Sequence, residues 1–220
     1  MLLRFLAREI SKLLGRSAGD SPADLPQVER RLGSWHHADI EWMAGRVRGV
    51  AGDFAEIGVF RGAAFRKLAL LAAQQSRQAH AFDSFVGMDE PGAADGSQYP
   101  KRKFDIGGPD AFVRLMTEAG VPRVTYTVWA GYVPGCFKRT PDALRFALAM
   151  VDLDHYRPTV DALNWLAPRL NDGGLLALDD YVPSHDGLAT RAIREFLAGN
   201  RHFEKIAFFN QQLILRKLPR

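Results

Sequence analysis

The sequence has almost no cysteine and no long apolar run. Its 220 residues include one cysteine, Cys136, so the chain cannot form an intramolecular disulfide, which fits a reducing compartment. Because no run of about 18 apolar residues occurs, no segment is predicted to span a membrane. The amino-terminal stretch MLLRFLAREISKLLG is interrupted by charges, which argues against a signal peptide. We therefore expect a cytoplasmic protein in which Cys136 is a packing residue rather than a nucleophile.

Long runs of one charge are absent as well. The 29 Lys and Arg residues stand among 25 Asp and Glu residues, for a net charge of +4, and the densest basic segment is Lys101–Lys103. Proteins that bind nucleic acid usually carry a denser basic surface. A solvated basic surface is the favoured interpretation, and a nucleic-acid partner is not expected. Internal repeats and low-complexity segments are also absent.

From Gly52 onward, the apolar residues follow a strand–helix alternation. Strands are expected at Phe54–Ile57, His80–Phe82, Val124–Trp129, Phe146–Val151 and Leu175–Leu178, with helices at Ala63–Gln75, Asp110–Ala119, Thr159–Leu170 and Leu188–Leu197. This pattern is typical of βαβ units and a parallel sheet covered on both faces. Two last strands, Phe203–Phe208 and Gln212–Lys217, are too close for a crossover helix, so they predict an antiparallel hairpin. The fold class is α/β: a Rossmann-like, seven-stranded, mostly parallel sheet ending in that hairpin.

The first 50 residues do not share this alternation. Residues 1–15 show an amphipathic helical pattern, residues 16–26 are rich in Gly, Ser, Pro and Asp like a linker, and residues 27–48 predict a second helix. We therefore divide the chain into an N-terminal helical extension, residues 1–50, and an α/β domain, residues 51–220. The linker predicts that the first helix packs over the substrate site as a lid, or against the other subunit of a homodimer.

A glycine-containing turn follows the first predicted strand, with the sequence EIGVFRG. Glycines at a strand-to-helix turn let the backbone approach a ligand closely. The G-x-x-x-G spacing differs from the G-x-G-x-x-G of a pyrophosphate-binding turn. Asp83 ends the next strand, 25 residues beyond Gly58, where a carboxylate can accept hydrogen bonds from two ribose hydroxyls. A nucleoside-type cofactor is expected to contact Glu56, Gly58, Val59, Phe60, Arg61, Gly62, Asp83, Ser84, Gly131, Tyr132 and Asp152.

Acidic residues end the fourth and fifth predicted strands. These are Asp152 and Asp154, followed by Asp179 and Asp180. Neighbouring strands of such a sheet end side by side, so these carboxylates should converge, and oxygen clusters of this kind suit Mg²⁺ or Ca²⁺. Asp179 and Asp180 would point to opposite faces if the strand continued, so both can bind one ion only if the strand ends there. His185, a few residues further on, is a candidate base.

With these residues assembled, the sequence resembles the macrocin O-methyltransferase-like family of class I S-adenosylmethionine-dependent methyltransferases. The resemblance rests on GDFAEIGVFRG, DSFVGMDEP, VDLDHYRPTVDALNWLAPRLNDGGLLALDDY and TRAIREFL, between residues 52 and 197. It implies an enzyme that methylates hydroxyls of sugars on natural products. It also implies a metal ion held by Asp152, Asp179 and Asp180, with Asp154 replacing or supporting Asp152.

The mechanism expected from this resemblance is an in-line transfer of methyl to an acceptor hydroxyl assisted by Mg²⁺. Asp152, Asp154 or His185 would remove the hydroxyl proton. Catechols are a second class of acceptor, because catechol-type methyltransferases use a similar trio of acids. Two rivals are an RNA methyltransferase, suggested only by the basic charge, and a membrane-surface binding protein using the basic first helix.

Overall fold

The computed structural model describes residues 37–92, 94–95, 100–184, 187–209 and 212–219. The predicted helix over residues 1–15, the linker after it, residues 27–36 of the predicted second helix and the candidate base His185 lie outside the described residues. Within the described ranges, no helix is both long enough and apolar enough to cross a membrane.

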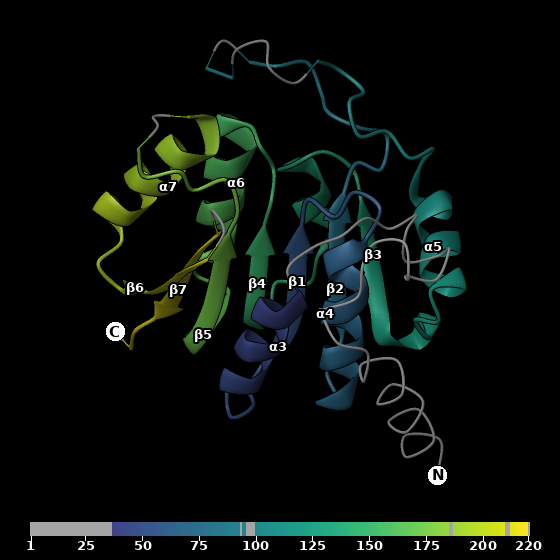
Figure 1. Cartoon of the computed structure of the whole chain (residues 1–220), viewed down its shortest axis with the longest axis horizontal. Coiled ribbons are helices and arrows are strands. Elements are labelled where there is room, and N and C mark those ends of the chain that lie inside the picture. Colours follow the sequence, from purple (N-terminus) through teal and green to yellow (C-terminus); the bar gives the residue numbers. More distant parts are fainter. Residues whose placement is uncertain (1–36, 93, 96–99, 185–186, 210–211, 220) are drawn as a thin grey trace.

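Seven strands form one sheet, in the spatial order β3-β2-β1-β4-β5-β7-β6 (Figure 1). The strands are β1 Asp53–Ile57, β2 Ala79–Asp83, β3 Tyr126–Ala130, β4 Phe146–Val151, β5 Leu170–Leu178, β6 Phe203–Phe209 and β7 Gln212–Lys217. The first five pair in parallel, and β7 is antiparallel to both β5 and β6. The predicted fold class, including the terminal antiparallel hairpin, is therefore confirmed.

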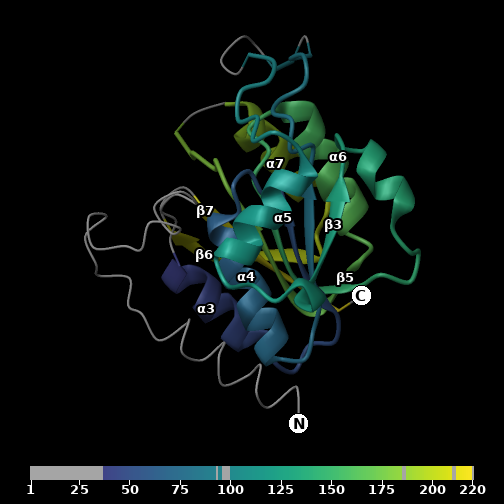
Figure 2. The same ribbon diagram turned by 90° about the vertical axis from the view of Figure 1, so that its right-hand side faces the viewer.

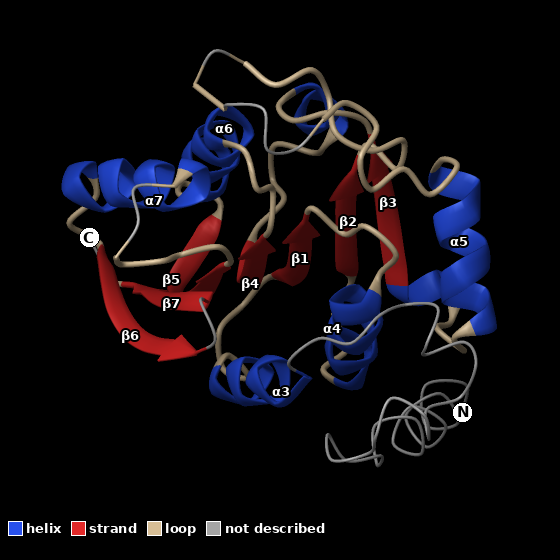
Figure 3. Cartoon of the chain, turned by 45° about the horizontal axis from the view of Figure 1, so that its top comes forward, coloured by secondary structure: helices blue, strands red, loops and turns tan. Residues whose placement is uncertain are grey.

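Helices cover both faces of the sheet (Figures 2 and 3). They are α3 His37–Arg46, α4 Ala63–Gln74, α5 Pro109–Glu118, α6 Tyr156–Leu166 and α7 Leu188–Gly199, with short 3-10 turns η1 Arg123–Thr125 and η2 Gly135–Arg139. Successive residues of β1 face opposite sides, as the pleat of a strand requires. Phe54 packs in the core beneath α3, α4 and α5, whereas Ala55 packs in the core beneath α6 and α7.

Helix α3 belongs to the stretch that the sequence assigns to the N-terminal extension. Its residues Ile40 and Met43 are buried in the same core as Leu68 of α4. The described part of the extension thus packs on the sheet domain. The domain boundary at residue 50 and the role of the preceding residues stay predictions.

Three predicted element bounds are wrong. Val124 lies in η1 and is 71% exposed, and β3 begins only at Tyr126. The reason is a turn closed by Thr125, whose hydroxyl and backbone N–H both donate hydrogen bonds to Pro122 O. Helix α6 begins at Tyr156 and ends at Leu166 rather than spanning 159–170. Leu170 instead starts β5, which runs through Gly173 and Gly174. The register of β5 against β4 shifts there, as in a bulge.

The carboxyl ends of the parallel strands meet at one edge of the sheet, and the long connection after β2 rises above it (Figure 1). We call residues 84–108 the roof loop. Its two arms lie against each other: Met88 N–H donates to Lys103 O at 2.8 Å, and Arg102 N–H donates to Met88 O at 2.9 Å. A Cβ at Gly87 would lie 2.6 Å from the backbone of Arg102, so only glycine allows this close approach.

Candidate active site

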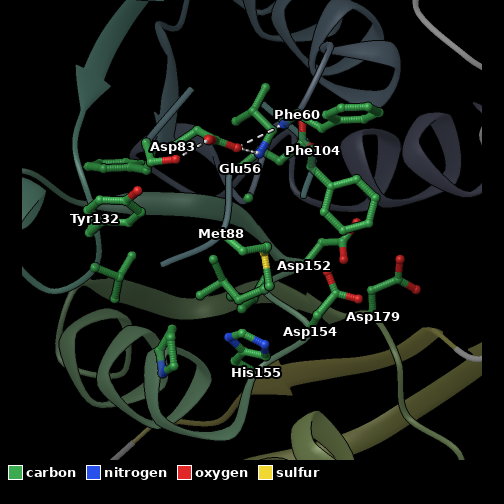
Figure 4. Close-up of a pocket in the computed structure, with 18 of the residues that line it drawn as sticks. Glu56, Phe60, Asp83, Met88, Phe104, Tyr132, Asp152, Asp154, His155 and Asp179 are labelled. Atoms are coloured by element: carbon green, nitrogen blue, oxygen red, sulfur yellow. Dashed lines mark hydrogen bonds between the residues drawn. The ribbon is translucent and has the colours of Figure 1, made fainter. Parts of the chain in front are cut away.

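A cavity of about 460 Å³ opens at the carboxyl edge of the sheet, beneath the roof loop (Figure 4). This is the edge at which open α/β sheets bind ligands, and the volume is typical of a small-molecule site. All the described residues predicted to contact cofactor or metal line this one cavity. They are Glu56, Gly58, Val59, Phe60, Arg61, Gly62, Asp83, Ser84, Gly131, Tyr132, Asp152, Asp154, Asp179 and Asp180.

The glycine turn between β1 and α4 is shaped by contacts within the protein. Gly58 and Gly62 both have positive φ, 88° and 86°. A Cβ at Gly58 would lie 1.6 Å from Asp152 O, and one at Gly62 would strike the Met116 and Phe112 side chains. Both positions therefore require glycine for close packing. The turn brings the backbone N–H groups of Val59 and Phe60 to the cavity wall.

Asp83 ends β2 and binds this turn. Its Oδ2 accepts hydrogen bonds from Val59 N at 2.8 Å and Phe60 N at 2.9 Å (Figure 4). Its Oδ1 accepts one from Phe85 N at 2.7 Å. The carboxylate thus joins the end of β2 to the glycine turn and to the start of the roof loop. Carboxylate oxygens have further lone pairs, so the same group can also accept bonds from a ligand in the cavity.

Glu56 lies at the floor of the cavity and is 4% exposed. Its Oε2 has no hydrogen-bond partner within the described part of the chain. Burial, and then the negative charges of Asp83 and Asp179, raise the pKa of Glu56 well above its ordinary value. A buried carboxyl in this state is a ready donor or acceptor for a polar ligand group.

The structure brings together the carboxyl groups of Asp152, Asp154 and Asp180, each with an oxygen within 4.8 Å of the others. Asp154 and Asp180 adopt the left-handed conformation, with φ of 58° and 56°. Such strain in non-glycine residues concentrates at functional sites. β5 ends at Leu178, so the alternation of a strand no longer separates the two acids that follow it. We call Asp152, Asp154 and Asp180 the acid trio.

The acid trio differs by one member from the predicted metal ligands. Asp154 takes the place of Asp179, whose N–H bonds to Val151 O at 2.9 Å at the end of β4. Asp179 remains close, because its charge is one cause of the raised pKa of Asp152, after burial and ahead of Asp154 and Asp180. The pKa of Asp180 rises to about 6, through burial and the neighbouring Asp154. The acids therefore repel one another, and a bound cation would relieve that repulsion.

The two ends of the cavity differ in chemistry. Figure 4 shows Tyr132 and Asp83 toward one end and the carboxylates of Asp152, Asp154 and Asp179 toward the other. Phe104 of the roof loop packs edge-on against Phe60, with ring centroids 5.2 Å apart, and lies on the side of the acids. Phe60 and Phe104, which we call the aromatic wall, therefore lie at the acidic end of the cavity.

Asp95 is a site residue that no local feature of the sequence singles out. It is 3% exposed and lines the cavity from the roof loop. Its Oδ1 accepts hydrogen bonds from the first N–H groups of α6, Tyr156 N at 2.6 Å and Arg157 N at 3.4 Å, while Oδ2 accepts one from Gly92 N at 3.0 Å. These hydrogen bonds join the roof loop to α6, the helix that begins two residues after Asp154.

Cys136 lies apart from these groups. The side chain is buried in η2, and burial raises the pKa of the thiol to about 11. A thiol with such a pKa stays protonated near neutral pH and is a weak nucleophile. The packing role expected from the sequence agrees with this environment.

Solved structures of methyltransferases share this fold. The O-methyltransferase NovP superposes with a TM-score of 0.72 at 20% identity, covering 99% of this chain and 98% of that one. The calicheamicin methyltransferase CalS11 gives 0.67 at 22% identity, over 97% and 91% of the two chains. The architecture is therefore the Rossmann-like fold of class I methyltransferases.

The sequence comparisons identify the family. Residues 28–208 match the macrocin-O-methyltransferase (TylF) family, and the chain belongs to it. A tetracenomycin rhamnosyl 4'-O-methyltransferase of Streptomyces olivaceus is 36% identical over 153 residues, 61% of this chain and 54% of that protein. The mycinamicin III 3''-O-methyltransferase of Micromonospora griseorubida is 32% identical over 145 residues, 60% and 56%. The chain thus matches about half the length of these relatives.

Proposed function

We propose that this chain is an S-adenosylmethionine-dependent O-methyltransferase that acts, with Mg²⁺, on a hydroxyl of a sugar or another small natural product. The observation that carries the proposal is the cavity with two chemically different ends, Asp83 at one and the acid trio at the other. The family and the names of the two sequence relatives, both sugar O-methyltransferases, support it.

The cofactor end of the cavity suits an adenosyl group. Asp83 would accept hydrogen bonds from the ribose hydroxyls while it keeps the glycine turn in place. Tyr132 is 39% exposed and lines the cavity, so its ring is available to flank an adenine. Glu56 would meet a polar group of the cofactor at the floor. S-adenosylmethionine supplies an electrophilic methyl group on a sulfonium.

The acid trio suits a hard divalent cation, because three carboxyl groups can each offer one oxygen. Mg²⁺ at this point would lower the pKa of an acceptor hydroxyl and fix its orientation. Asp152, Asp154 and Asp180 would hold it, with Asp179 beside them in support. Either Asp154 or Asp152 would then take the hydroxyl proton as general base. His185 stays the alternative base expected from the sequence.

The test has two parts. Calorimetry should first detect binding of S-adenosylhomocysteine to the whole chain. Transfer of radiolabelled methyl to a panel of rhamnosides should then stop in EDTA and return on addition of Mg²⁺ or Mn²⁺. Absence of cofactor binding would refute the proposal as a whole, whereas undiminished transfer in thorough chelation would refute the role of the metal.

Catechols are the second class of acceptor, and the aromatic wall favours including them. Phe60 and Phe104 could pack a flat ring beside the acid trio. The same assay with a catechol in place of the rhamnosides decides between the two classes by their ratio of kcat/KM.

A further inference from the structure

A buried threonine of α7 bonds to the backbone of the segment that carries Asp180. Thr190 is 1% exposed and lies in the first turn of that helix. Its hydroxyl donates a hydrogen bond to Asp180 O at 2.8 Å and accepts one from Val182 N–H at 2.9 Å. A hydroxyl has one proton to donate, so that of Thr190 is directed at the peptide backbone. One side chain thus joins the backbone on both sides of Tyr181 to α7.

The placement of Asp180 needs such support. Its φ of 56° lies in the left-handed region, which costs a residue with a side chain about 1–2 kcal/mol. Its carboxyl group also has an oxygen within 4.8 Å of oxygens of Asp152 and Asp154, and like charges this close repel one another. Backbone strain and charge repulsion both favour another position for this carboxylate in metal-free protein, so contacts elsewhere must hold it in the acid trio.

The backbone contacts of this segment come from two different elements. Before Asp180, the N–H of Asp179 donates to Val151 O at 2.9 Å, at the end of β4. After it, the Asp180 carbonyl bonds to Thr190. The next side chain, Tyr181, is 8% exposed and packs in the core beneath α6 and α7. The peptide units that flank Asp180 are therefore fixed by β4 on one side and by α7 on the other.

We propose that Thr190 is a positioning residue of the metal site: by bonding to Asp180 O and Val182 N–H, it keeps the Asp180 carboxylate in place to bind Mg²⁺. Thr190 is not one of the described residues that line the cavity, so it acts through the backbone of Asp180. Groups that orient a metal ligand contribute about 10–100-fold to metal affinity. The inference rests on the proposed function, because it concerns the metal ion that this function uses.

Thr190→Val tests the proposal, because valine keeps the β-branched shape and lacks the hydroxyl. We expect the affinity for Mn²⁺, titrated by electron paramagnetic resonance without any acceptor, to fall by about 10–100-fold. Thr190→Ser retains the hydroxyl and should bind Mn²⁺ nearly as tightly as the parent chain. The affinity for S-adenosylhomocysteine, measured by calorimetry, should stay unchanged in both variants, since Asp83 and the glycine turn follow β2 and β1 rather than bonding to α7.

Thr125→Val is the matched control for a purely structural effect. Thr125 is 6% exposed, and its hydroxyl also donates to a backbone carbonyl, Pro122 O at 2.7 Å. It lies just before the start of β3, at the end of that strand away from the cavity. Urea titration should show a loss of stability in this variant, as in Thr190→Val, whereas its affinity for Mn²⁺ should equal that of the parent chain.

An unchanged Mn²⁺ affinity in Thr190→Val, or an equal loss in Thr125→Val, would overturn the proposal. Circular dichroism reports whether each variant folds. If Thr190→Val does not, Thr190→Ala takes its place with the same two outcomes, because alanine removes the hydroxyl without setting a methyl group against the two polar backbone groups. Failure of the proposed function would instead appear in the parent chain, as absence of S-adenosylhomocysteine or Mn²⁺ binding.

Discussion

The carboxylate of Asp95 accepts a hydrogen bond at 2.6 Å from the backbone N–H of Tyr156, across 61 residues of sequence. Tyr156 is the first residue of α6 and follows the acid trio residue Asp154 by two positions. One side chain therefore connects the roof loop, a helix amino terminus and the segment that presents the acids. A side chain that caps a helix satisfies N–H groups that have no partner within the helix.

Replacement of Asp95 by alanine should destabilise the protein and remove the hydrogen bonds that join the roof loop to α6. We expect the free energy of unfolding to fall by about 0.5–2 kcal/mol, the usual cost of a lost helix cap. Denaturant titration measures this change. Because the roof loop would also lose its attachment to α6, S-adenosylhomocysteine should dissociate faster, as stopped-flow fluorescence would record.

Asp95→Asn separates the two contacts of the side chain. An amide oxygen can still cap α6 in place of Oδ1, but the amide nitrogen cannot accept the bond that Gly92 N–H donates to Oδ2. We expect this variant to keep most of the stability. A stability of Asp95→Ala equal to that of the parent protein would contradict the capping role.

Asp83→Ala should weaken the binding of S-adenosylmethionine by about 1.5–3 kcal/mol, the scale of hydrogen bonds to a charged group. From its position at a strand end alone, Asp83 would matter little to the fold. In the structure, however, its carboxylate also accepts hydrogen bonds from Val59 N and Phe60 N. Some loss of stability should therefore accompany the loss of affinity measured by calorimetry.

Asp53→Ala is the matched control for this measurement. Asp53 begins β1, at the end of that strand away from the cavity, and its carboxylate also accepts a hydrogen bond from a backbone N–H, that of Gln78 at 3.1 Å. Its removal should lower stability and leave the affinity for S-adenosylmethionine unchanged. Equal cofactor affinities in Asp83→Ala and Asp53→Ala would refute the ribose assignment.

The acid trio predicts an order among the aspartate variants. Asp152→Asn, Asp154→Asn and Asp180→Asn should each cut the methyl-transfer rate by at least about a hundredfold. Asp179 stands beside the trio rather than within it, so Asp179→Asn should weaken Mn²⁺ binding by about 10–100-fold, the effect of a supporting group. Titration of Mn²⁺ by electron paramagnetic resonance gives these affinities, while circular dichroism serves as the control for folding. A larger loss in Asp179→Asn than in Asp154→Asn would restore the ligand set expected from the family.

The fold and the place of the site could be predicted because local patterns specify them. An acid directly after an apolar strand marks the carboxyl edge of a parallel sheet, so Asp83, Asp152 and Asp179 were placed at one cavity from spacing alone. The alternation of strands and helices predicted the order of the elements, and the short gap between the last two strands excluded a crossover helix, so the predicted hairpin agrees with the structure.

What could not be predicted depends on distant contacts or on backbone conformation. Asp95 meets Tyr156 only because the roof loop folds back over the sheet, and no local pattern encodes that path. Asp180 was predicted as a metal ligand, but the grouping of Asp154 rather than Asp179 with Asp152 and Asp180 was not. Asp154 and Asp180 both adopt the left-handed conformation, which most side chains avoid and which the residue type does not dictate. The early start of β5 at Leu170 depends on a close backbone contact, because a Cβ at Gly174 would lie 2.7 Å from Asn171 O.

Glu56 offers a measurement that needs neither acceptor nor metal. Its carboxyl is buried, and burial, followed by the negative charges of Asp83 and Asp179, raises its pKa well above the value of 4.5 expected in the unfolded chain. The folded state therefore binds a proton that the unfolded state has already lost at intermediate pH. By linkage, the free energy of unfolding should fall as the pH rises from that unfolded value toward the folded pKa of Glu56.

Glu56→Gln should remove this dependence, because glutamine does not ionise. In protein free of cofactor and metal, we expect the variant to match the parent near pH 4 and to exceed its stability by about 1–3 kcal/mol at pH 8, the scale of a buried group without a partner. Urea titrations across this range measure the difference. Glu195→Gln is the control of opposite sign, since hydrogen bonds from the Tyr156 hydroxyl and Arg191 lower the pKa of the exposed Glu195. That substitution should reduce stability near neutral pH and lose its effect in acid. A constant difference between Glu56→Gln and the parent at every pH would show that Glu56 titrates alike in the folded and unfolded chain.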